Sequence, residues 1–179
     1  MLTVGDPFPE FHTQACFGND AKSDLRPIND RTDEGMWKVF VFYPKDFTFV
    51  CPTELVEFGR QINEFKDRDA VVYGASTDNE FAHLAWRQSH EDLHSLPYPL
   101  IAAQKLANEL GIVHPKEGVA LRATYIVDPH GIVQFAACNN LNCGRSVKEV
   151  LRVLDAIQSD ELCPCNWEKG QETLSVGAE

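Results

Sequence analysis

Apolar residues along the first part of the chain occur either in short continuous runs or at the spacing of a helix. Residues 37–43 are an apolar run rich in β-branched and aromatic side chains, which predicts a buried strand that ends at Pro44. After Cys51, apolar residues recur every three or four positions, which predicts an amphipathic helix to about Asp67. The same criteria predict strands at 70–77 and 98–102 and helices at 79–89 and 105–111.

The remainder of the chain predicts a hairpin and a last helix. Two apolar runs, 121–127 and 132–138, flank the turn sequence Asp-Pro-His-Gly, and an amphipathic helix follows Ser146. Strands that alternate with helices favour parallel pairing, and the hairpin adds antiparallel strands. We therefore expect an α/β fold that is thioredoxin-like in outline, with a mixed central sheet flanked by helices. Residues 158–179 lack this periodicity, so we expect a domain over 1–157 and a C-terminal tail over 158–179.

Charge and hydropathy argue against several classes of function. The 179 residues fit a single globular domain, and the formal charge of −11 argues against partners that present phosphate, such as nucleic acids or anionic membranes. The N-terminus has no basic and apolar leader, and no apolar stretch is long enough to cross a bilayer. We expect a cytoplasmic protein with neither a nucleic-acid nor a membrane partner.

Six cysteines are many for a cytoplasmic chain of this size, and in a reducing compartment such residues are more often catalytic, redox-sensing or metal-binding than structural. They are Cys16, Cys51, Cys138, Cys143, Cys163 and Cys165. Cys51 differs from the others because it follows the predicted strand and precedes Pro52, a residue suited to the first turn of a helix. A thiol at a helix N-terminus faces unpaired N–H groups and ionises more readily. Cys51 is therefore the candidate nucleophile.

The residues around Cys51 form a specific signature. Pro44, Thr48 and Cys51 stand in the spacing Pro-x3-Thr-x2-Cys, and positions 163–167 read Cys-Pro-Cys-Asn-Trp. Together these resemble the peroxiredoxins, in particular the typical two-cysteine members of the alkyl hydroperoxide reductase C type, in a variant with an extra tail cysteine. The resemblance covers nearly the whole chain. It implies a thiol-specific peroxidase that reduces hydrogen peroxide and organic hydroperoxides without a cofactor or a metal.

The chemistry of peroxide reduction gives these residues roles. It needs a thiolate, a donor at the breaking O–O bond and a positive charge for the anionic transition state. Cys51 is expected to attack the terminal oxygen, and the Thr48 hydroxyl, about one helical turn earlier, can meet both sulfur and substrate. Arg122, from a distant strand, is expected to supply the charge. Pro44 is expected to shield the pocket from water.

The resemblance also implies supporting residues and a second thiol. Glu54 and Arg145 are expected to orient Arg122, and Trp86 falls where relatives have an aromatic residue that lines the pocket, although core packing alone would explain it. After the attack Cys51 is a sulfenic acid, which a resolving thiol converts to a disulfide. By resemblance the resolving thiol is Cys163, and Cys165 is an alternative resolver or an exchange thiol.

Partners follow from the same resemblance. In typical members the resolving cysteine comes from the other subunit, which implies a head-to-tail homodimer with each tail exchanged onto its partner. Such dimers assemble into rings, and a decamer or dodecamer is expected. The expected reductant is thioredoxin or a dedicated alkyl hydroperoxide reductase partner.

Other interpretations of the cysteines and histidines stay open at this point. Cys138, Cys143 and the two tail cysteines could hold zinc, but Cys-x-Cys is tighter than usual zinc spacing. His90 and His94 could share a helical face as metal ligands, although a solvated helix end fits better. Cys16 is expected to fill space near an N-terminal strand, and Cys138 with Cys143 could form a local disulfide or stay inert.

Two other functions compete with a peroxidase. A redox-regulated chaperone or peroxide sensor could use the same scaffold, but it needs none of Cys51, Thr48 and Arg122. A general thiol–disulfide oxidoreductase would need Cys-x-x-Cys, and position 54 is glutamate. A thiol peroxidase is therefore the leading hypothesis.

Overall fold

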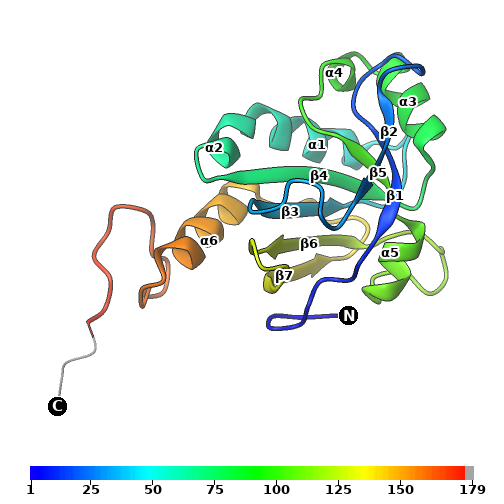
Figure 1. Ribbon diagram of the computed structural model, residues 1–179. Coiled ribbons are helices and arrows are strands. Elements are labelled where there is room, and N and C mark those ends of the chain that lie inside the picture. The colour runs from blue at the N-terminus through cyan, green and yellow to red at the C-terminus, as the bar shows by residue number, and fades with distance from the viewer. Residues whose placement is uncertain (176–179) are drawn as a thin grey trace. The chain divides into compact units, whose positions relative to one another are not determined.

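The computed structural model describes residues 1–175. Their strands are β1 (His12–Cys16), β2 (Leu25–Asn29), β3 (Trp37–Phe42), β4 (Ala70–Ser76), β5 (Leu100–Ala102), β6 (Arg122–Val127) and β7 (Val133–Asn139). These seven strands of the described chain form one sheet in the order β2-β1-β5-β4-β3-β6-β7 (Figure 1). β3, β4 and β5 pair in parallel, and the other neighbours pair antiparallel. The mixed sheet expected from the sequence is confirmed.

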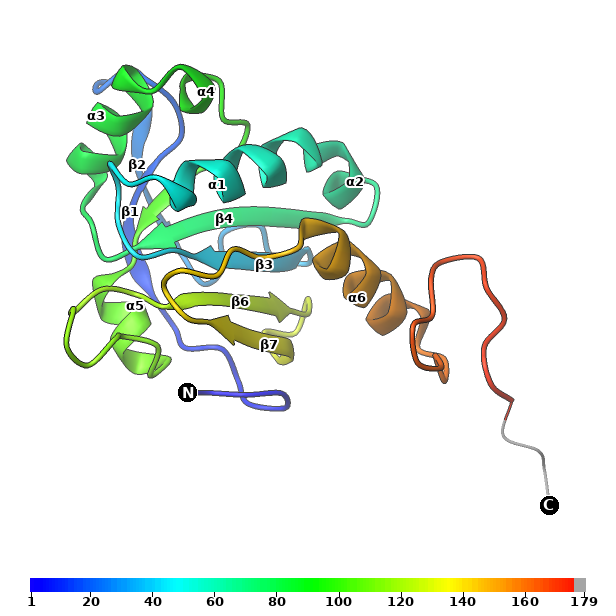
Figure 2. The same cartoon turned by 180° about the vertical axis from the view of Figure 1, so that it is seen from behind.

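The helices are α1 (Val50–Arg60), α2 (Ile62–Lys66), α3 (Glu80–Ser89), α4 (Glu91–His94), α5 (Gln104–Glu109) and α6 (Val147–Ser159). Figures 1 and 2 place α1 and α2 over one face of the sheet, along β4, and α5 over the other face. Side chains of a strand alternate between the faces. Phe40 and Phe42 of β3 accordingly join the core that includes Leu106 of α5. Val39 and Val41, also fully buried, point to the α1 side.

The predicted elements largely match the observed ones. Asn79 caps α3, because its side-chain oxygen accepts a hydrogen bond from the Ala82 N–H at 2.9 Å. The single helix expected from Cys51 to Asp67 is instead two helices. Gln61, with φ −93° and ψ 10°, leaves the helical conformation between α1 and α2.

The sequence pattern did not predict the N-terminal hairpin of β1 and β2. β2 contains Pro27 and lies at the edge of the sheet, where Arg26 and Pro27 are exposed. An edge strand with polar residues lacks the apolar alternation that identifies a strand from sequence. The short helix α4 was also not predicted, because its four residues are too few to show a period.

Two compact units make up the chain, Met1–Arg145 and a second that begins at Ser146. In the second unit, Ser146 caps α6 by accepting a hydrogen bond from the Glu149 N–H at 3.2 Å. The segment after α6 is attached to it, since Arg152 Nη1 donates to the Trp167 carbonyl at 3.0 Å. The division into a domain over 1–157 and a tail over 158–179 is a different one and stays a prediction.

None of the described helices is long and apolar enough to cross a membrane. No group of three or more His, Cys, Asp or Glu side chains in this part of the chain could hold a metal ion. The zinc alternative for the cysteines therefore finds no support among the described residues.

Candidate active site

Cys51 lies in the first turn of α1, as the sequence predicts. β3 ends at Phe42, and Pro44, which has no N–H to continue the sheet, begins the loop 44–49 that leads into the helix. The N-cap residue, Phe49, makes no side-chain capping hydrogen bond. The N–H groups of the first turn therefore have no side-chain acceptor at the cap, and they favour an anion close by. The Cys51 side chain is fully buried.

Arg122, the first residue of β6, brings a positive charge to Cys51. Its Nη1 lies 3.5 Å from Cys51 Sγ and 2.6 Å from Glu54 Oε2. Its Nε donates to the Leu141 carbonyl at 2.7 Å, which fixes the plane of the guanidinium. Both partners of the Arg122–Glu54 ion pair are about 4% exposed, so water screens the pair little. The sequence placed Arg122 near Cys51, and the structure brings the two side chains together.

Glu54 ties Arg122 to a second arginine. Arg145 forms a fork on this carboxylate, with Nε 2.8 Å from Oε1 and Nη2 2.9 Å from Oε2, and its backbone N–H donates to Oε1 at 2.9 Å. Burial alone would raise the pKa of the Glu54 carboxyl, but the hydrogen bonds and charge of Arg145 and the charge of Arg122 outweigh it. The pKa of Glu54 is therefore below its ordinary value. Glu54 stays ionised and holds both guanidinium groups.

This cluster carries a positive charge that an anion can balance. Glu54 contributes one negative charge, and Arg122 and Arg145 contribute one positive charge each, so the sum is +1. The site is buried, so this charge acts at low effective dielectric on whatever lies beside Arg122. A thiolate and the oxygens of a breaking peroxide bond are the kinds of group that it stabilises.

Three other residues named from the sequence lie on or under the loop 44–49. Pro44 is buried, as expected of a residue that keeps water from the site. The Thr48 hydroxyl donates to the Lys45 carbonyl at 3.0 Å, a bond within the loop. Trp86 is 1% exposed, and its ring centroid lies 6.0 Å from that of Tyr43 and 6.1 Å from that of Phe47. The contact of Thr48 with a bound peroxide stays a prediction, and Trp86 packs beneath the loop.

The tail cysteines lie in the second unit. Cys163 is partly buried, with Sγ 3.4 Å from Ser159 Oγ and 3.9 Å from the Ala156 carbonyl, whereas Cys165 is exposed. Both line an open hollow of about 730 Å³ beside α6. All six cysteines are free thiols in this structure.

The other thiols are poorer nucleophiles or lie apart from each other. Burial raises the pKa of Cys16 and of Cys138 above the ordinary thiol value. Asn139 lies opposite Arg122 in the sheet and contacts Cys143, with Nδ2 3.7 Å from its Sγ. Cys138, one residue earlier on the strand, points to the opposite face. This arrangement argues against a local disulfide between Cys138 and Cys143.

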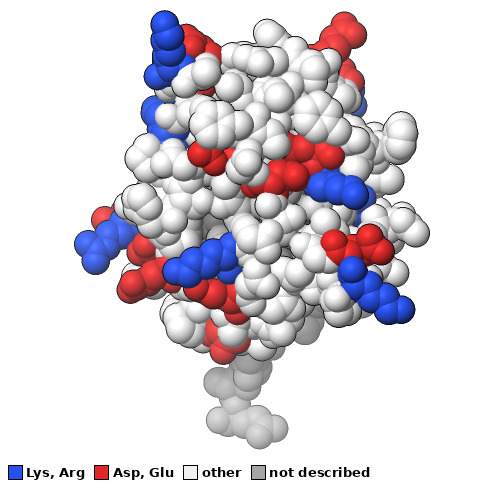
Figure 3. Space-filling model, turned by 90° about the vertical axis from the view of Figure 1, so that its right-hand side faces the viewer, with Lys and Arg blue, Asp and Glu red and all other residues white. Residues whose placement is uncertain are grey.

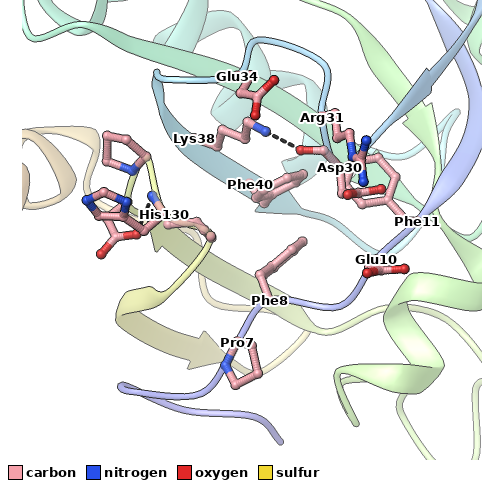
Figure 4. A pocket seen from close by; sticks show the side chains of 14 residues that line it. Pro7, Phe8, Glu10, Phe11, Asp30, Arg31, Glu34, Lys38, Phe40 and His130 are labelled. Carbon is pink, nitrogen blue, oxygen red and sulfur yellow. Dashed lines mark hydrogen bonds between the residues drawn. The ribbon is translucent and has the colours of Figure 1, made fainter.

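A second hollow, of about 310 Å³, lies beside Lys38 and Phe40 of β3 (Figure 4). Cys51 follows the C-terminal end of this strand in the sequence. The wall of the hollow includes Phe8 and Lys38, and the Lys38 ammonium donates to the Asp30 carbonyl. Burial lowers the pKa of Lys38 below its ordinary value even though carboxylates lie nearby. None of the residues that line this hollow carries sulfur.

Comparison with known proteins decides the family. The model of the AhpC/TSA family matches residues 4–136. The chain belongs to the AhpC/TSA family. Alkyl hydroperoxide reductase C of Mycolicibacterium smegmatis is 49% identical over 99% of this chain and 95% of its own length.

Solved structures of AhpC/TSA proteins share the fold. AhpC of Mycobacterium tuberculosis superposes with a TM-score of 0.85 at 46% identity, over 94% of this chain and 99% of the other. The reduced 2-Cys peroxiredoxin of Plasmodium vivax gives a TM-score of 0.89 at 32% identity, over 97% of this chain and 93% of the other. The expected thioredoxin-like peroxiredoxin fold and the expected class of enzyme, a thiol peroxidase, are both confirmed.

The sequence analysis named Cys51 and Arg122 but not every residue that holds them. Leu141 was missed because it contributes only a backbone carbonyl, which leaves no mark on residue type. Asp46 and His83 were also missed. They form a buried contact between the loop 44–49 and α3, with Asp46 Oδ2 2.7 Å from His83 Nδ1.

Proposed function

We propose that the protein reduces hydrogen peroxide and organic hydroperoxides through the Cys51 thiolate. The observation that carries this proposal is the 3.5 Å contact between Arg122 Nη1 and Cys51 Sγ, within a buried cluster that Glu54 and Arg145 complete. The family supports it, because relatives at 48–49% identity are named alkyl hydroperoxide reductase C.

In the first step the Cys51 sulfur bonds to the terminal peroxide oxygen, which keeps its hydrogen, and the O–O bond breaks. The products are a sulfenic acid on Cys51 and an alkoxide or hydroxide, which takes up a proton as it leaves. Arg122 stabilises the negative charge as it moves from sulfur to the leaving oxygen. Thr48 positions the peroxide by hydrogen bonding, and Pro44 limits water in the pocket.

A peroxide substrate does not require a strongly charged protein surface. Figure 3 shows the side of the molecule on which α3 and α5 lie, where acidic and basic side chains stand in small groups amid uncharged surface. Hydrogen peroxide is neutral, so its approach needs no charged funnel. Specificity therefore resides in the buried cluster around Cys51.

In the second step a thiol attacks the sulfenic sulfur, and water leaves as a disulfide forms. Cys163 of the partner subunit is the resolving thiol, and Cys165 exchanges the disulfide outward or replaces it. Because Cys51 is fully buried and disulfide Cα atoms lie within about 7 Å, the first turn of α1 opens before the bond can form.

The proposed assembly is a head-to-tail homodimer with exchanged tails, gathered into a ring of ten or twelve subunits. The reductant is thioredoxin or a dedicated alkyl hydroperoxide reductase partner, and the protein acts in the cytoplasm. A chaperone or sensor role on the same scaffold is not favoured, because the buried ion cluster around Cys51 serves chemistry that a scaffold does not need.

Single substitutions distinguish the roles of Cys163 and Cys165. One equivalent of hydrogen peroxide is expected to link wild-type subunits into a covalent dimer on a non-reducing gel, through Cys51 and Cys163. Cys163→Ser should remove most of the dimer, and Cys165→Ser should keep it. Peptide mapping identifies the linkage. A dimer that survives in C163S but not in C165S would reassign the resolving thiol to Cys165, and no linkage in either would contradict resolution within this chain.

A further inference from the structure

In the loop 44–49, the residue before Thr48 has a backbone conformation that its side chain does not favour. Phe47, the residue before Thr48, has φ +57°, in the left-handed region that a bulky side chain seldom adopts. A residue of this kind persists only where its surroundings fix it. Phe47 is itself 60% exposed, so its side chain, which contacts Trp86, supplies only part of that restraint.

Asp46, one residue earlier, supplies the restraint. It is 6% exposed, and its backbone N–H donates to Asp78 Oδ2 at 2.8 Å. The Tyr43 hydroxyl donates to Asp46 Oδ1 at 2.8 Å, and His83 Nδ1 lies 2.7 Å from Asp46 Oδ2. Burial first, and then the nearby Asp46 charge, raise the pKa of Tyr43 well above its ordinary value, so this hydroxyl keeps the proton that it donates.

Hydrogen-bond counting locates one more proton in this cluster. His83 Nε2 lies 3.1 Å from the Ile101 carbonyl, which can only accept, so Nε2 carries a hydrogen. A bare Nδ1 and an ionised carboxylate oxygen cannot bond to each other, so a proton also lies between His83 Nδ1 and Asp46 Oδ2. The pair is then neutral as a whole, which suits side chains that are 0% and 1% exposed.

We propose that Asp46 and His83 are positioning residues for peroxide reduction, a one-proton pair that fixes the strained loop and thereby places the Thr48 hydroxyl beside Cys51. The inference rests on the proposed function. Asp46 is two residues from Thr48, and the Thr48 hydroxyl closes the loop on the Lys45 carbonyl at 3.0 Å. Trp86 packs against both Tyr43 and Phe47 and so supports the chain on either side of Asp46. A shift of Asp46 is therefore expected to move the loop.

The pair acts on peroxide reduction and not on the thiol itself, and this gives a test. Two rates are measured on each reduced variant, the rate of Cys51 oxidation by hydrogen peroxide and the rate of Cys51 alkylation by iodoacetamide, both followed by peptide mass spectrometry. Alkylation needs the thiolate but no hydroxyl to steady an O–O bond. Asp46→Ala is expected to slow oxidation by about 10²-fold, as misplaced groups do, and to leave alkylation within about twofold.

The conservative variant Asp46→Asn tests the role of the proton between Asp46 and His83. In Asp46→Asn the amide N–H can donate to a bare His83 Nδ1 while the amide oxygen still accepts from Tyr43, so oxidation should recover to within about threefold of wild type. Tyr43→Phe, which removes only one hydroxyl, should slow oxidation about three- to tenfold without changing alkylation. It keeps the test decisive should D46A fold poorly.

Three results would overturn the inference. They are unchanged oxidation in D46A and Y43F, an equal fall of oxidation and alkylation in both, or D46N as slow as D46A. A Cys51→Ser control distinguishes failure of the proposed function from failure of this inference. If peroxide consumption survives in C51S, Cys51 is not the nucleophile, and the proposed function itself fails.

Discussion

Replacing Cys51 by serine is expected to lower the second-order rate constant for peroxide consumption by at least about 10⁴-fold, the size of loss seen when a covalent nucleophile is removed. A serine hydroxyl in the same place stays protonated at neutral pH and forms no sulfenic acid. The Arg122 contact to the side chain at position 51 then stabilises no charge. The measurement is the rate of peroxide loss with excess thiol reductant.

The matched control is Cys143→Ser. Cys143 is an exposed thiol in the loop that carries Leu141 and Arg145. Among the described residues, its sulfur has contacts with Asn139 and Gly144 and none with Cys51 or Arg122. It should retain a wild-type rate within about twofold. Peroxide consumption that depends on Cys143 and persists in C51S would contradict the assignment of the nucleophile.

The second large effect is expected at Glu54. Glu54→Gln removes the negative charge between two buried guanidinium groups, and breaking one partner of such a buried network costs about 3–5 kcal/mol of unfolding free energy. The same change frees Arg122 from its 2.6 Å contact and should slow peroxide reduction. Urea unfolding followed by circular dichroism measures the first effect.

Glu57→Gln is the control for this variant. Glu57 is 42% exposed and pairs with Arg60 at 3.5 Å, so its loss should cost under about 1 kcal/mol. Equal destabilisation by E54Q and E57Q would show that the buried cluster is not the stabilising feature that its geometry indicates.

The same carboxylate gives stability a pH dependence with a definite sign. Its pKa is lower in the folded protein than in the unfolded chain, where it has the ordinary value of about 4.5. The stabilisation is therefore complete above that value and is lost as pH falls through the lower, folded value. In E54Q this part of the acid-induced loss should be absent.

The sequence predicted those parts of the fold where burial leaves a pattern. β3 and β4 are buried on both faces, so their apolar runs marked them clearly. β2 at the edge of the sheet and the neighbouring β1 both carry polar and exposed residues, and β1 also pairs with β5, a strand far along the chain. The break at Gln61 is a backbone event that the apolar spacing, continuous across it, cannot reveal.

The residues of the site likewise divide into those that the sequence identified and those that it did not. Cys51 and Arg122 were named because a signature and the needs of peroxide chemistry specify residue types, and Glu54 and Arg145 were named from the family resemblance. Asp46 and His83 were not, since the two residues are separated by 37 positions and neither type is unusual where it stands. Only the fold brings Asp46 and His83 together.

The most direct test of the account asks which thiol the peroxide oxidises first. The variant with both Cys163→Ser and Cys165→Ser cannot resolve a sulfenic acid through the tail, so one equivalent of hydrogen peroxide with a 1,3-dione trap should label the primary site. The account predicts that mass spectrometry finds the adduct on Cys51, and that Arg122→Ala slows its formation by about 10²–10³-fold. An adduct predominantly on Cys143, Cys138 or Cys16, with Cys51 still reduced, would contradict it.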